Sequence, residues 1–183
     1  MELLFATSNL HKVKMIQAIL GYPVQQVNLD LPEIQAVIVQ DVIEQKAQAA
    51  FQAIGKPVLV EDTSLSFAAW NGLPGALIRW FVDGVGNDGL CQMLAGFEER
   101  EATAETCLGY FDGHRFVSFS GTVKGQIANS PRGDNGFGWD PIFIPKGWDK
   151  TFAEMTEAET AVFVSMRKTA VLQLKAYLDG QTG

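Results

Sequence analysis

Basic residues are scarce in this 183-residue chain, which has 14 lysines and arginines against 21 aspartates and glutamates and a formal net charge of −7. Proteins that bind duplex or long single-stranded nucleic acid do so through a basic surface. The composition therefore argues against a nucleic acid polymer as partner. A single nucleotide stays compatible with it, because a nucleotide needs only a few local cations.

Cysteines, histidines and long apolar runs are also few. Cys91 and Cys107 lack the spacing of metal ligands, and we expect buried thiols in a reducing compartment, with a disulfide as the alternative. His11 and His114 fall where turns or solvent are expected, so neither is assigned a catalytic role and the general base is expected to be a carboxylate. No apolar run approaches the length of a membrane span, and residues 1–6 lack the basic flank of a signal peptide. We therefore expect no membrane association and a cytoplasmic location.

The rest of the composition, 47% hydrophobic and 19% charged, is ordinary for a globular protein. The length suits one good-sized core or two small lobes that share one, and we expect a single domain over residues 1–183. Strands and helices alternate in the first half, whereas Asp112-Gly113 predicts a hairpin in the second half. This order predicts an α/β fold with a mixed sheet. The expected strands are residues 3–6, 24–29, 34–39, 57–60, 106–111, 115–123 and 142–144.

The expected helices have apolar faces at helical spacing and recognisable ends. The first follows Ser8 or Asn9 and ends near Gly21, and the second is expected to be capped by Asp41 and to end at Gly55. Two short helices are expected at residues 76–81 and 87–96, and a capping box at Thr156 and Glu159 starts a helical stretch that Ser165 restarts and Gly180 ends. Trp80, Phe81 and Met93 are expected in the core rather than on a dimer surface.

The stretch from Pro57 to Thr63 organises the candidate chemistry. Its apolar run predicts a buried strand that ends at Glu61, Asp62 and Thr63. Ligands of open α/β sheets bind beyond the carboxyl ends of strands. Two adjacent carboxylates there repel each other, and Mg²⁺ would relieve the repulsion because it prefers hard oxygen ligands. An acidic turn without function is the alternative for this stretch alone.

Further polar residues fall at the boundaries of other elements. If these segments converge, they combine carboxylates for a metal, cations for phosphates and aromatic rings for a base, which suits phosphoryl chemistry on a nucleotide. The P-loop pattern is absent. Taken singly, the lysines are more often solvated, and Phe137 and Trp139 are more often core residues. The segments are Thr7, Ser8, Asn9 and Lys12; Glu33 with Lys46; Glu61 to Thr63 with Arg79; and Phe137 to Asp140 with Arg167.

These motifs resemble the inosine triphosphate pyrophosphatase (Ham1-type) family, in the right order over nearly the whole chain. The matching segments are Thr7-Ser8-Asn9-Leu10-His11-Lys12, Asp30-Leu31-Pro32-Glu33, Val60-Glu61-Asp62-Thr63, Gly72-Leu73-Pro74-Gly75, Arg79-Trp80-Phe81, Pro131-Arg132-Gly133 and Phe137-Gly138-Trp139-Asp140-Pro141. The resemblance implies an elongated mixed sheet flanked by helices, with two lobes and a central nucleotide cleft. It also implies a Mg²⁺-dependent homodimer that hydrolyses ITP, dITP and XTP to the monophosphate and pyrophosphate and so clears the nucleotide pool.

The resemblance also implies roles for individual residues. Asp62 and Lys12 would be catalytic, and Glu33 and Asp62 would hold Mg²⁺, with Glu61 as a further metal candidate. The segment from Thr7 to Lys12, including Ser8 and Asn9, would bind phosphates together with Lys46. Thr63 and Arg79 would contact the substrate. Phe137 would stack on the base, Gly138, Trp139 and Asp140 would shape its pocket, and Arg167 would donate to a keto oxygen at the purine 6-position.

Three positions depart from the family pattern. Ser8 replaces a glycine, Thr160 stands at the probable position of a lysine, and Met166 stands at that of a histidine. A lost polar contact in a binding site costs about 1–3 kcal/mol. These departures leave two alternatives open: a pyrophosphatase for another base, including a pyrimidine or a modified base, and a nucleotide-binding protein that has lost turnover. They also leave open the choice between ribose and deoxyribose.

Overall fold

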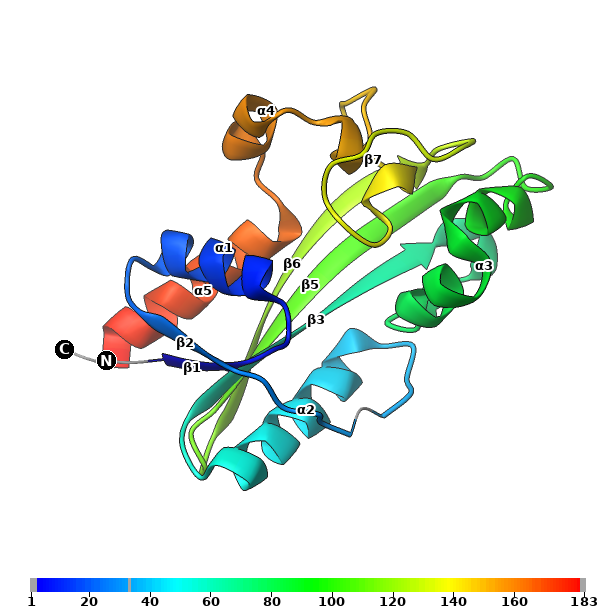
Figure 1. The fold of residues 1–183 in the computed structure, drawn as a ribbon. Coiled ribbons are helices and arrows are strands. Elements are labelled where there is room, and N and C mark those ends of the chain that lie inside the picture. The colour runs from blue at the N-terminus through cyan, green and yellow to red at the C-terminus, as the bar shows by residue number, and fades with distance from the viewer. Residues whose placement is uncertain (1–2, 33, 182–183) are drawn as a thin grey trace. The chain divides into compact units, whose positions relative to one another are not determined.

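The computed structural model describes residues 3–32 and 34–181 (Figure 1). The chain forms two compact units. Unit 1 comprises the residues up to 63, residues 106–121 and the residues from 165 onward, and unit 2 comprises residues 64–105 and 122–164. Strands β3 (Val58–Phe67), β5 (Glu101–Phe111) and β6 (Phe116–Ile127) contribute residues to both units.

In the described part of the chain, seven strands form one mixed sheet in the order β2-β1-β3-β5-β6-β7, with β4 paired to β3. Strand β1 runs parallel to β2 and β3, whereas β4 and β7 run antiparallel to their partners. The predicted α/β class with a mixed sheet is therefore confirmed. The other strands are β1 (Leu3–Ala6), β2 (Val24–Val27), β4 (Pro74–Gly75) and β7 (Phe143–Pro145).

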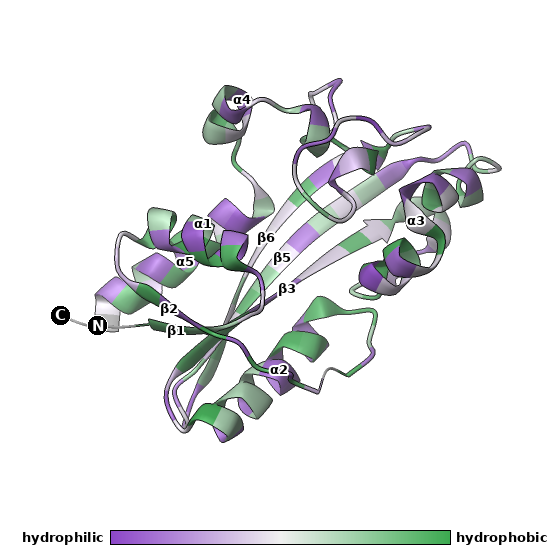
Figure 2. Ribbon diagram, in the orientation of Figure 1, coloured by the Kyte–Doolittle hydropathy of each residue, from purple (hydrophilic) through white to green (hydrophobic). Residues whose placement is uncertain are grey.

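Helices alternate with the strands in the first half of the sequence, and two further helices follow the last strand. They are α1 (Leu10–Leu20), α2 (Val39–Ile54), α3 (Ile78–Met93), α4 (Glu157–Val162) and α5 (Met166–Gln181), with short 3₁₀ segments at Ala68–Trp70, Asp140–Ile142 and Phe152–Glu154. Figure 2 shows hydrophobic and hydrophilic residues interleaved along α1 and α5, as expected of helices with one face on a core. No helix in the described part of the chain is long and apolar enough to cross a membrane.

The core of unit 1 lies between the sheet and the helices α1 and α5. Ile16 and Leu20 of α1 and Leu174 of α5 are buried against strand residues such as Phe5 and Leu59. Gly21 and Gly55 end α1 and α2 in the left-handed conformation, as the sequence predicts. The apolar spacing of these helices thus accounts for the packing that holds β1 and β3 in place.

The core of unit 2 is rich in aromatic side chains. Trp139 meets Phe143 edge to face with ring centroids 5.7 Å apart, and Phe152 lies 5.0 Å from Phe143. Trp139 is only 8% exposed, so its ring belongs to this core. Cys91 and Cys107 are buried free thiols, which confirms that expectation.

Several predicted boundaries were wrong. Strand β3 continues to Phe67, so Glu61, Asp62 and Thr63 lie within the strand and not beyond its end, because apolar Leu65 and Phe67 carry on the burial pattern. No strand forms at residues 34–38, and α2 begins at Val39 with Ile38 as the cap, which places Asp41 inside the first turn.

The second half also differs in detail from its prediction. Strand β5 begins at Glu101, five residues before the predicted start at residue 106. The two short helices form α3, which is interrupted at Gly86 with φ of 69°. Trp80 and Met93 are 63% and 46% exposed, so the prediction that they lie in the core was wrong. The capping box at Thr156 and Glu159 is confirmed.

Candidate functional site

A charged cluster in unit 1 surrounds the middle of β3. Lys12 of α1 and Arg167 of α5 both contact the buried carboxylate of Glu61, at 2.8 Å from Lys12 Nζ and at 2.9 and 3.0 Å from Arg167 Nε and Nη2. Lys46 of α2 donates to the backbone carbonyl of Glu61 at 3.4 Å. The structure therefore brings together four residues that the sequence proposed singly, from four different elements.

The start of α1 is held by its own loop. Asn9 caps the helix, because its Oδ1 accepts from the backbone N–H groups of His11 and Lys12 at 3.0 and 3.2 Å. Thr7 Oγ1 accepts from the backbone N–H of Asn9 at 3.1 Å. These bonds fix the first turn of α1, from which Lys12 reaches Glu61. Ser8 is exposed beside them.

The electrostatics of the cluster keep Glu61 ionised. Burial by itself raises the pKa of Glu61, but the charges of Lys12 and Arg167 and their hydrogen bonds outweigh it and hold the pKa at about 2. Two cations around one carboxylate leave an excess positive charge. Such a site favours an anionic ligand, and phosphate is an anion that both lysine and arginine bind.

Asp62 and Thr63 follow on the same strand. Asp62 Oδ1 accepts from the backbone N–H of Thr63 at 2.8 Å, and both residues are partly exposed. Glu33, the other predicted metal ligand, lies outside the described residues. Among residues 3–32 and 34–181, no group of three or more His, Cys, Asp or Glu side chains is gathered as a metal site.

Mg²⁺, which the family resemblance implies, fits these donors in kind. It is usually bound through one or two carboxylates, with water and substrate phosphates as the other ligands. Asp62 supplies such a carboxylate. Both oxygens of Glu61 instead accept from Lys12 and Arg167, which leaves Asp62 as the better metal candidate of the two.

The aromatic segment from Phe137 to Asp140 lies in unit 2. Phe137 is 46% exposed, whereas Trp139 is buried in the core. Asp140 Oδ2 accepts from the backbone N–H of Phe137 at 2.8 Å, and Asn87 Nδ2 donates to the carbonyl of Gly138 at 2.9 Å. The side chains of Asp140 and Asn87 therefore hold the backbone of this segment, and the segment presents the exposed ring of Phe137.

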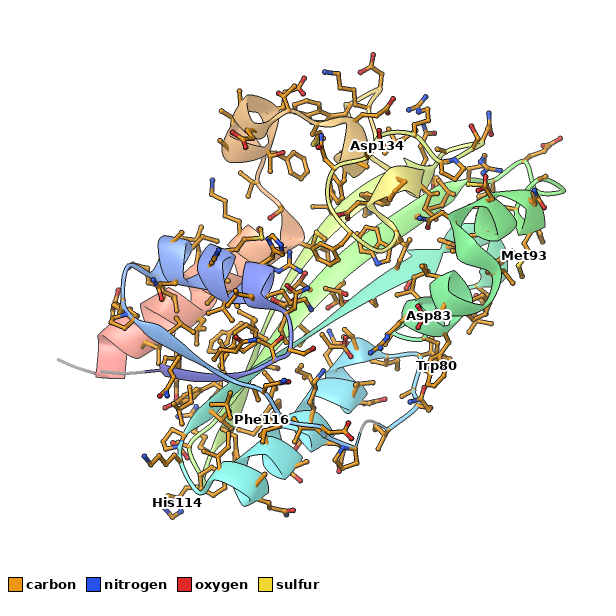
Figure 3. All side chains as sticks on the ribbon, in the orientation of Figure 1. Trp80, Asp83, Met93, His114, Phe116 and Asp134 are labelled. Atoms are coloured by element: carbon orange, nitrogen blue, oxygen red, sulfur yellow. The ribbon has the colours of Figure 1, made fainter. Side chains whose placement is uncertain are left out.

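Arg79 lies on the exposed side of α3. Its Nε is 3.5 Å from Asp83 Oδ2 one turn further on, and the Arg79 side chain is 82% exposed. Figure 3 shows Trp80 and Asp83 on the same helix, and His114 at the turn between β5 and β6. Arg79 belongs to unit 2, whereas Lys12, Glu61 and Arg167 belong to unit 1.

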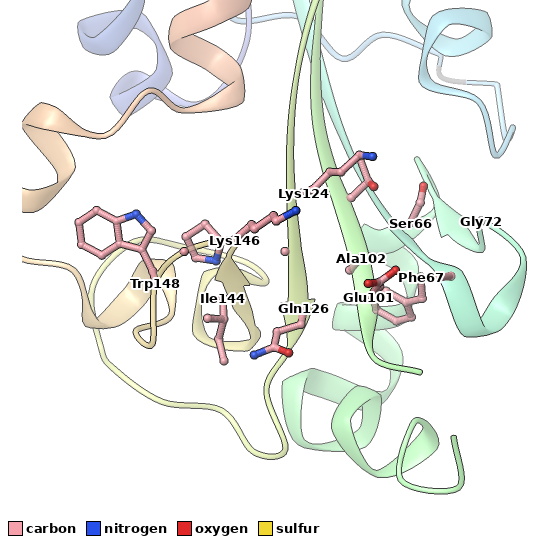
Figure 4. A pocket seen from close by; sticks show the side chains of 15 residues that line it. Ser66, Phe67, Gly72, Glu101, Ala102, Lys124, Gln126, Ile144, Lys146 and Trp148 are labelled. Atoms are coloured by element: carbon pink, nitrogen blue, oxygen red, sulfur yellow. The ribbon is translucent and has the colours of Figure 1, made fainter. Parts of the chain in front are cut away.

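A pocket of about 590 Å³ opens in unit 2 (Figure 4). Lys124 of β6 and Lys146, which directly follows β7, line it together with Glu101 and Trp148. None of the predicted site residues lines this pocket. It therefore carries no part of the candidate site.

Two further contacts were not predictable from the sequence, and a third was. The pairing of Glu61 with Arg167 joins residues 106 positions apart. Asn87 Nδ2 donates to the Gly138 carbonyl, and Asn87 Oδ1 is buried without a hydrogen-bond partner. Gly121 of β6 lies so close to Met166 that a Cβ there would overlap the Met166 carbonyl. A glycine in a strand is a known signal of close backbone approach, so Gly121 was the one detectable from sequence.

A family model described as the Ham1 family matches residues 3–177. The chain belongs to the Ham1 family. The inosine triphosphate pyrophosphatase of Yarrowia lipolytica is 45% identical over 183 residues, with 97% of this chain and 96% of the relative covered. The dITP/XTP pyrophosphatase of Methanopyrus kandleri is 43% identical, with 85% of each chain covered.

Solved structures of Ham1 proteins share the fold. The Staphylococcus aureus Ham1 protein superposes with a TM-score of 0.86 at 28% identity, over 99% of this chain and all of that chain. A Coxiella burnetii HAM1 protein gives a TM-score of 0.85 at 26% identity, over 98% of this chain and 99% of that one. The Ham1 membership inferred from the motifs is therefore confirmed over nearly the whole chain.

Proposed function

We propose that this chain is a Mg²⁺-dependent pyrophosphatase that hydrolyses ITP, dITP and XTP to the monophosphate and pyrophosphate. The observation that carries the proposal is the unit 1 cluster, in which Lys12, Lys46 and Arg167 surround β3 beside Asp62. The printed names of the Yarrowia lipolytica and Methanopyrus kandleri relatives support the substrate class.

The phosphates are bound by the cations and backbone groups of unit 1. Lys12 and Lys46 bind phosphate oxygens, and Thr7 to Asn9 form the loop that fixes the helix from which Lys12 extends. Attack on a triphosphate needs charge neutralisation, because the negative charges of the substrate repel the lone pair of the attacking water oxygen. Positioned lysines supply this neutralisation without reorganisation at the moment of reaction.

Asp62 is the catalytic carboxylate in this proposal. It would hold the metal together with Glu33. Its carboxylate would orient the attacking water and accept a proton from it, while the bond between the α-phosphorus and the bridging oxygen breaks and pyrophosphate leaves. The Thr63 backbone N–H donates to Asp62 Oδ1 at 2.8 Å, and this hydrogen bond fixes the orientation of the carboxylate. When bound, Mg²⁺ supplies charge neutralisation at the phosphate oxygens and lowers the pKa of a bound water. Neither histidine takes part, since His11 and His114 are both exposed.

The base is bound by the aromatic segment in this proposal. Phe137 stacks on the purine with its exposed ring, and Gly138, Trp139 and Asp140 shape the surrounding pocket. Thr63 and Arg79 contact the substrate, and Arg167 donates to the keto oxygen. Met166 is buried and Thr160 is exposed, so neither replaces the polar contacts of the family pattern, which keeps a different base as the second candidate.

A homodimer is also part of the proposal. The exposed Trp80 and Met93 of α3 supply apolar surface for it. Light scattering after size-exclusion chromatography tests it. A dimer that becomes a monomer in Trp80→Lys is the expected result, and a monomeric parent chain contradicts it.

The activity is tested with Mg²⁺ and a panel of ITP, XTP, dITP, the standard triphosphates and modified pyrimidine triphosphates. We expect pyrophosphate from the deaminated purines, lost on chelation and lost in Asp62→Asn. Asp179→Asn is the matched control, since it makes the same acid-to-amide change in α5. Release of pyrophosphate from a triphosphate with another base would show a different base specificity. Equal hydrolysis by Asp62→Asn and the parent would contradict the proposal.

A further inference from the structure

Glu61 is the most deeply enclosed charged group of the unit 1 cluster. Its side chain is 1% exposed, against 15% for Lys12 and 6% for Arg167. One oxygen, Oε1, lies 2.8 Å from Lys12 Nζ and 3.0 Å from Arg167 Nη2, and Oε2 lies 2.9 Å from Arg167 Nε. Both oxygens are therefore engaged, and the pairing with the guanidinium is bidentate.

The position of Glu61 makes it a link between separate elements. It lies on β3 directly before Asp62, while Lys12 comes from the first turn of α1 and Arg167 from the first turn of α5. Lysine is a flexible point charge on a four-carbon stem, and its direction is set by whatever it bonds. Lys12 therefore has its direction set by Glu61.

Stability does not account for this arrangement. The cost of removing three charges from water offsets most of their attraction, and replacement of buried ion clusters by apolar residues is often neutral or stabilising. Metal binding does not account for it either, because an ion at Glu61 would meet the positive charges of Lys12 and Arg167 at the same oxygens. The remaining effect is geometric: the carboxylate fixes where two cations point.

We propose that Glu61 is a positioning residue, which holds Lys12 and Arg167 in the orientation that binds the phosphates and the base of the substrate. This inference rests on the proposed function and deepens it. Glu61 does not touch the substrate or the metal itself. Its contribution is that Lys12 and Arg167 need no reorientation when the anionic ligand arrives.

Charge and position predict opposite results when Glu61 is neutralised. Glu61→Gln removes a negative charge beside two cations, so attraction alone would make an anion bind more tightly. Loss of positioning would make the anion bind more weakly. Glu61→Asp keeps the charge but is one methylene shorter, so it cannot reach both cations from the same backbone position. Attraction alone predicts no change for Glu61→Asp, whereas positioning predicts weaker binding.

The experiment measures the Kd of inorganic tripolyphosphate by calorimetry, in the parent, Glu61→Gln, Glu61→Asp and the control Asp179→Asn. Circular dichroism verifies that each variant is folded. We expect binding about tenfold weaker in both Glu61 variants, which corresponds to about 1.4 kcal/mol, and unchanged binding in Asp179→Asn. Equal or tighter binding in the folded Glu61 variants overturns the proposal, and Glu61→Asp decides the question where Glu61→Gln does not fold.

A second readout separates positioning from a loss of folded protein. The ratio of kcat/KM for ITP to kcat/KM for ATP does not depend on how much enzyme is active. Arg167 has only donors, so it bonds the keto oxygen of ITP and not the amino group of ATP. We expect the ratio to fall severalfold in Glu61→Asp, and an unchanged ratio counts against positioning of Arg167. Tripolyphosphate binding needs no turnover, so a parent chain that binds it but releases no pyrophosphate from ITP overturns the proposed function alone.

Discussion

Replacement of Gly121 by alanine is expected to displace the start of α5. Gly121 lies on β6, and a Cβ there would overlap the Met166 carbonyl and lie 2.8 Å from Thr169 Cβ. Carbon atoms pack at about 3.5–4.0 Å, so the two backbones must separate by about 1 Å. Neither contact atom is the end of a flexible side chain, so no rotamer change relieves the overlap.

That displacement reaches the charged cluster. Arg167 follows Met166 directly, and its bonds to Glu61 are 2.9 and 3.0 Å long. A shift of about 1 Å lengthens them to about 4 Å, beyond hydrogen-bonding range. Overpacking costs about 1–3 kcal/mol, and a weakened bond between charged groups adds to it. We expect the free energy of unfolding of Gly121→Ala to fall by about 3 kcal/mol.

The assay is urea denaturation followed by far-ultraviolet circular dichroism. Gly180→Ala is the matched control. Gly180 lies in α5, the helix that Gly121→Ala is expected to displace, and has open space around its Cβ position. Alanine is the better helix former by about 1 kcal/mol, so this control should be as stable as the parent or more so. If Gly121→Ala unfolds within about 0.5 kcal/mol of the parent, the range of ordinary surface changes, the reasoning is refuted.

Three further predictions concern other residues. The pKa of Tyr22 is raised to about 12 by its hydrogen bond to Asp179, by burial and by the Asp179 charge. The stability that this hydrogen bond contributes is therefore complete below pH 10.0 and is lost as the pH rises through about 12. Phenolate absorbance should show that Asp179→Asn returns the Tyr22 pKa toward its ordinary value, and an unmoved titration contradicts the assignment. Gly133→Ala should destabilise unit 2 by about 2 kcal/mol, seen by tryptophan fluorescence, because φ is +83° and the Cβ overlaps neighbouring backbone; equal stability counts against it. Phe137→Ala should raise the KM for ITP about tenfold, since base stacking is worth about 1–3 kcal/mol. The control Phe97→Ala removes a similarly exposed ring and should leave the KM unchanged. Equal effects of the two changes on the KM refute stacking.

The helices of unit 1 were predictable from sequence because their signals are local. Spacing of apolar residues and the glycine stops at Gly21 and Gly55 fix the ends of α1 and α2 within a few residues. The same holds for the capping box of α4 at Thr156. The end of β3 was not predictable in this way. Acidic and hydroxyl residues at positions 61–63 resemble a turn, but long-range packing of Leu65 and Phe67 keeps the strand extended.

The membership of the candidate site was predictable, whereas its bonding was not. Family motifs indicated Lys12, Glu61, Asp62 and Arg167 together. No local pattern shows that Glu61 accepts from residues 49 positions before it and 106 after it, because this depends on how α1 and α5 pack on β3. The exposure of Trp80 was not predictable either, because the expectation that it is buried rested on its apolar character alone.

The proposed reaction directs water to the α-phosphorus of a nucleoside triphosphate. Hydrolysis of ITP in water labelled with heavy oxygen, followed by mass spectrometry of both products, tests it most directly. We expect the label to enter the monophosphate and the pyrophosphate to carry none. Label in pyrophosphate, or release of orthophosphate with a diphosphate product, would contradict it.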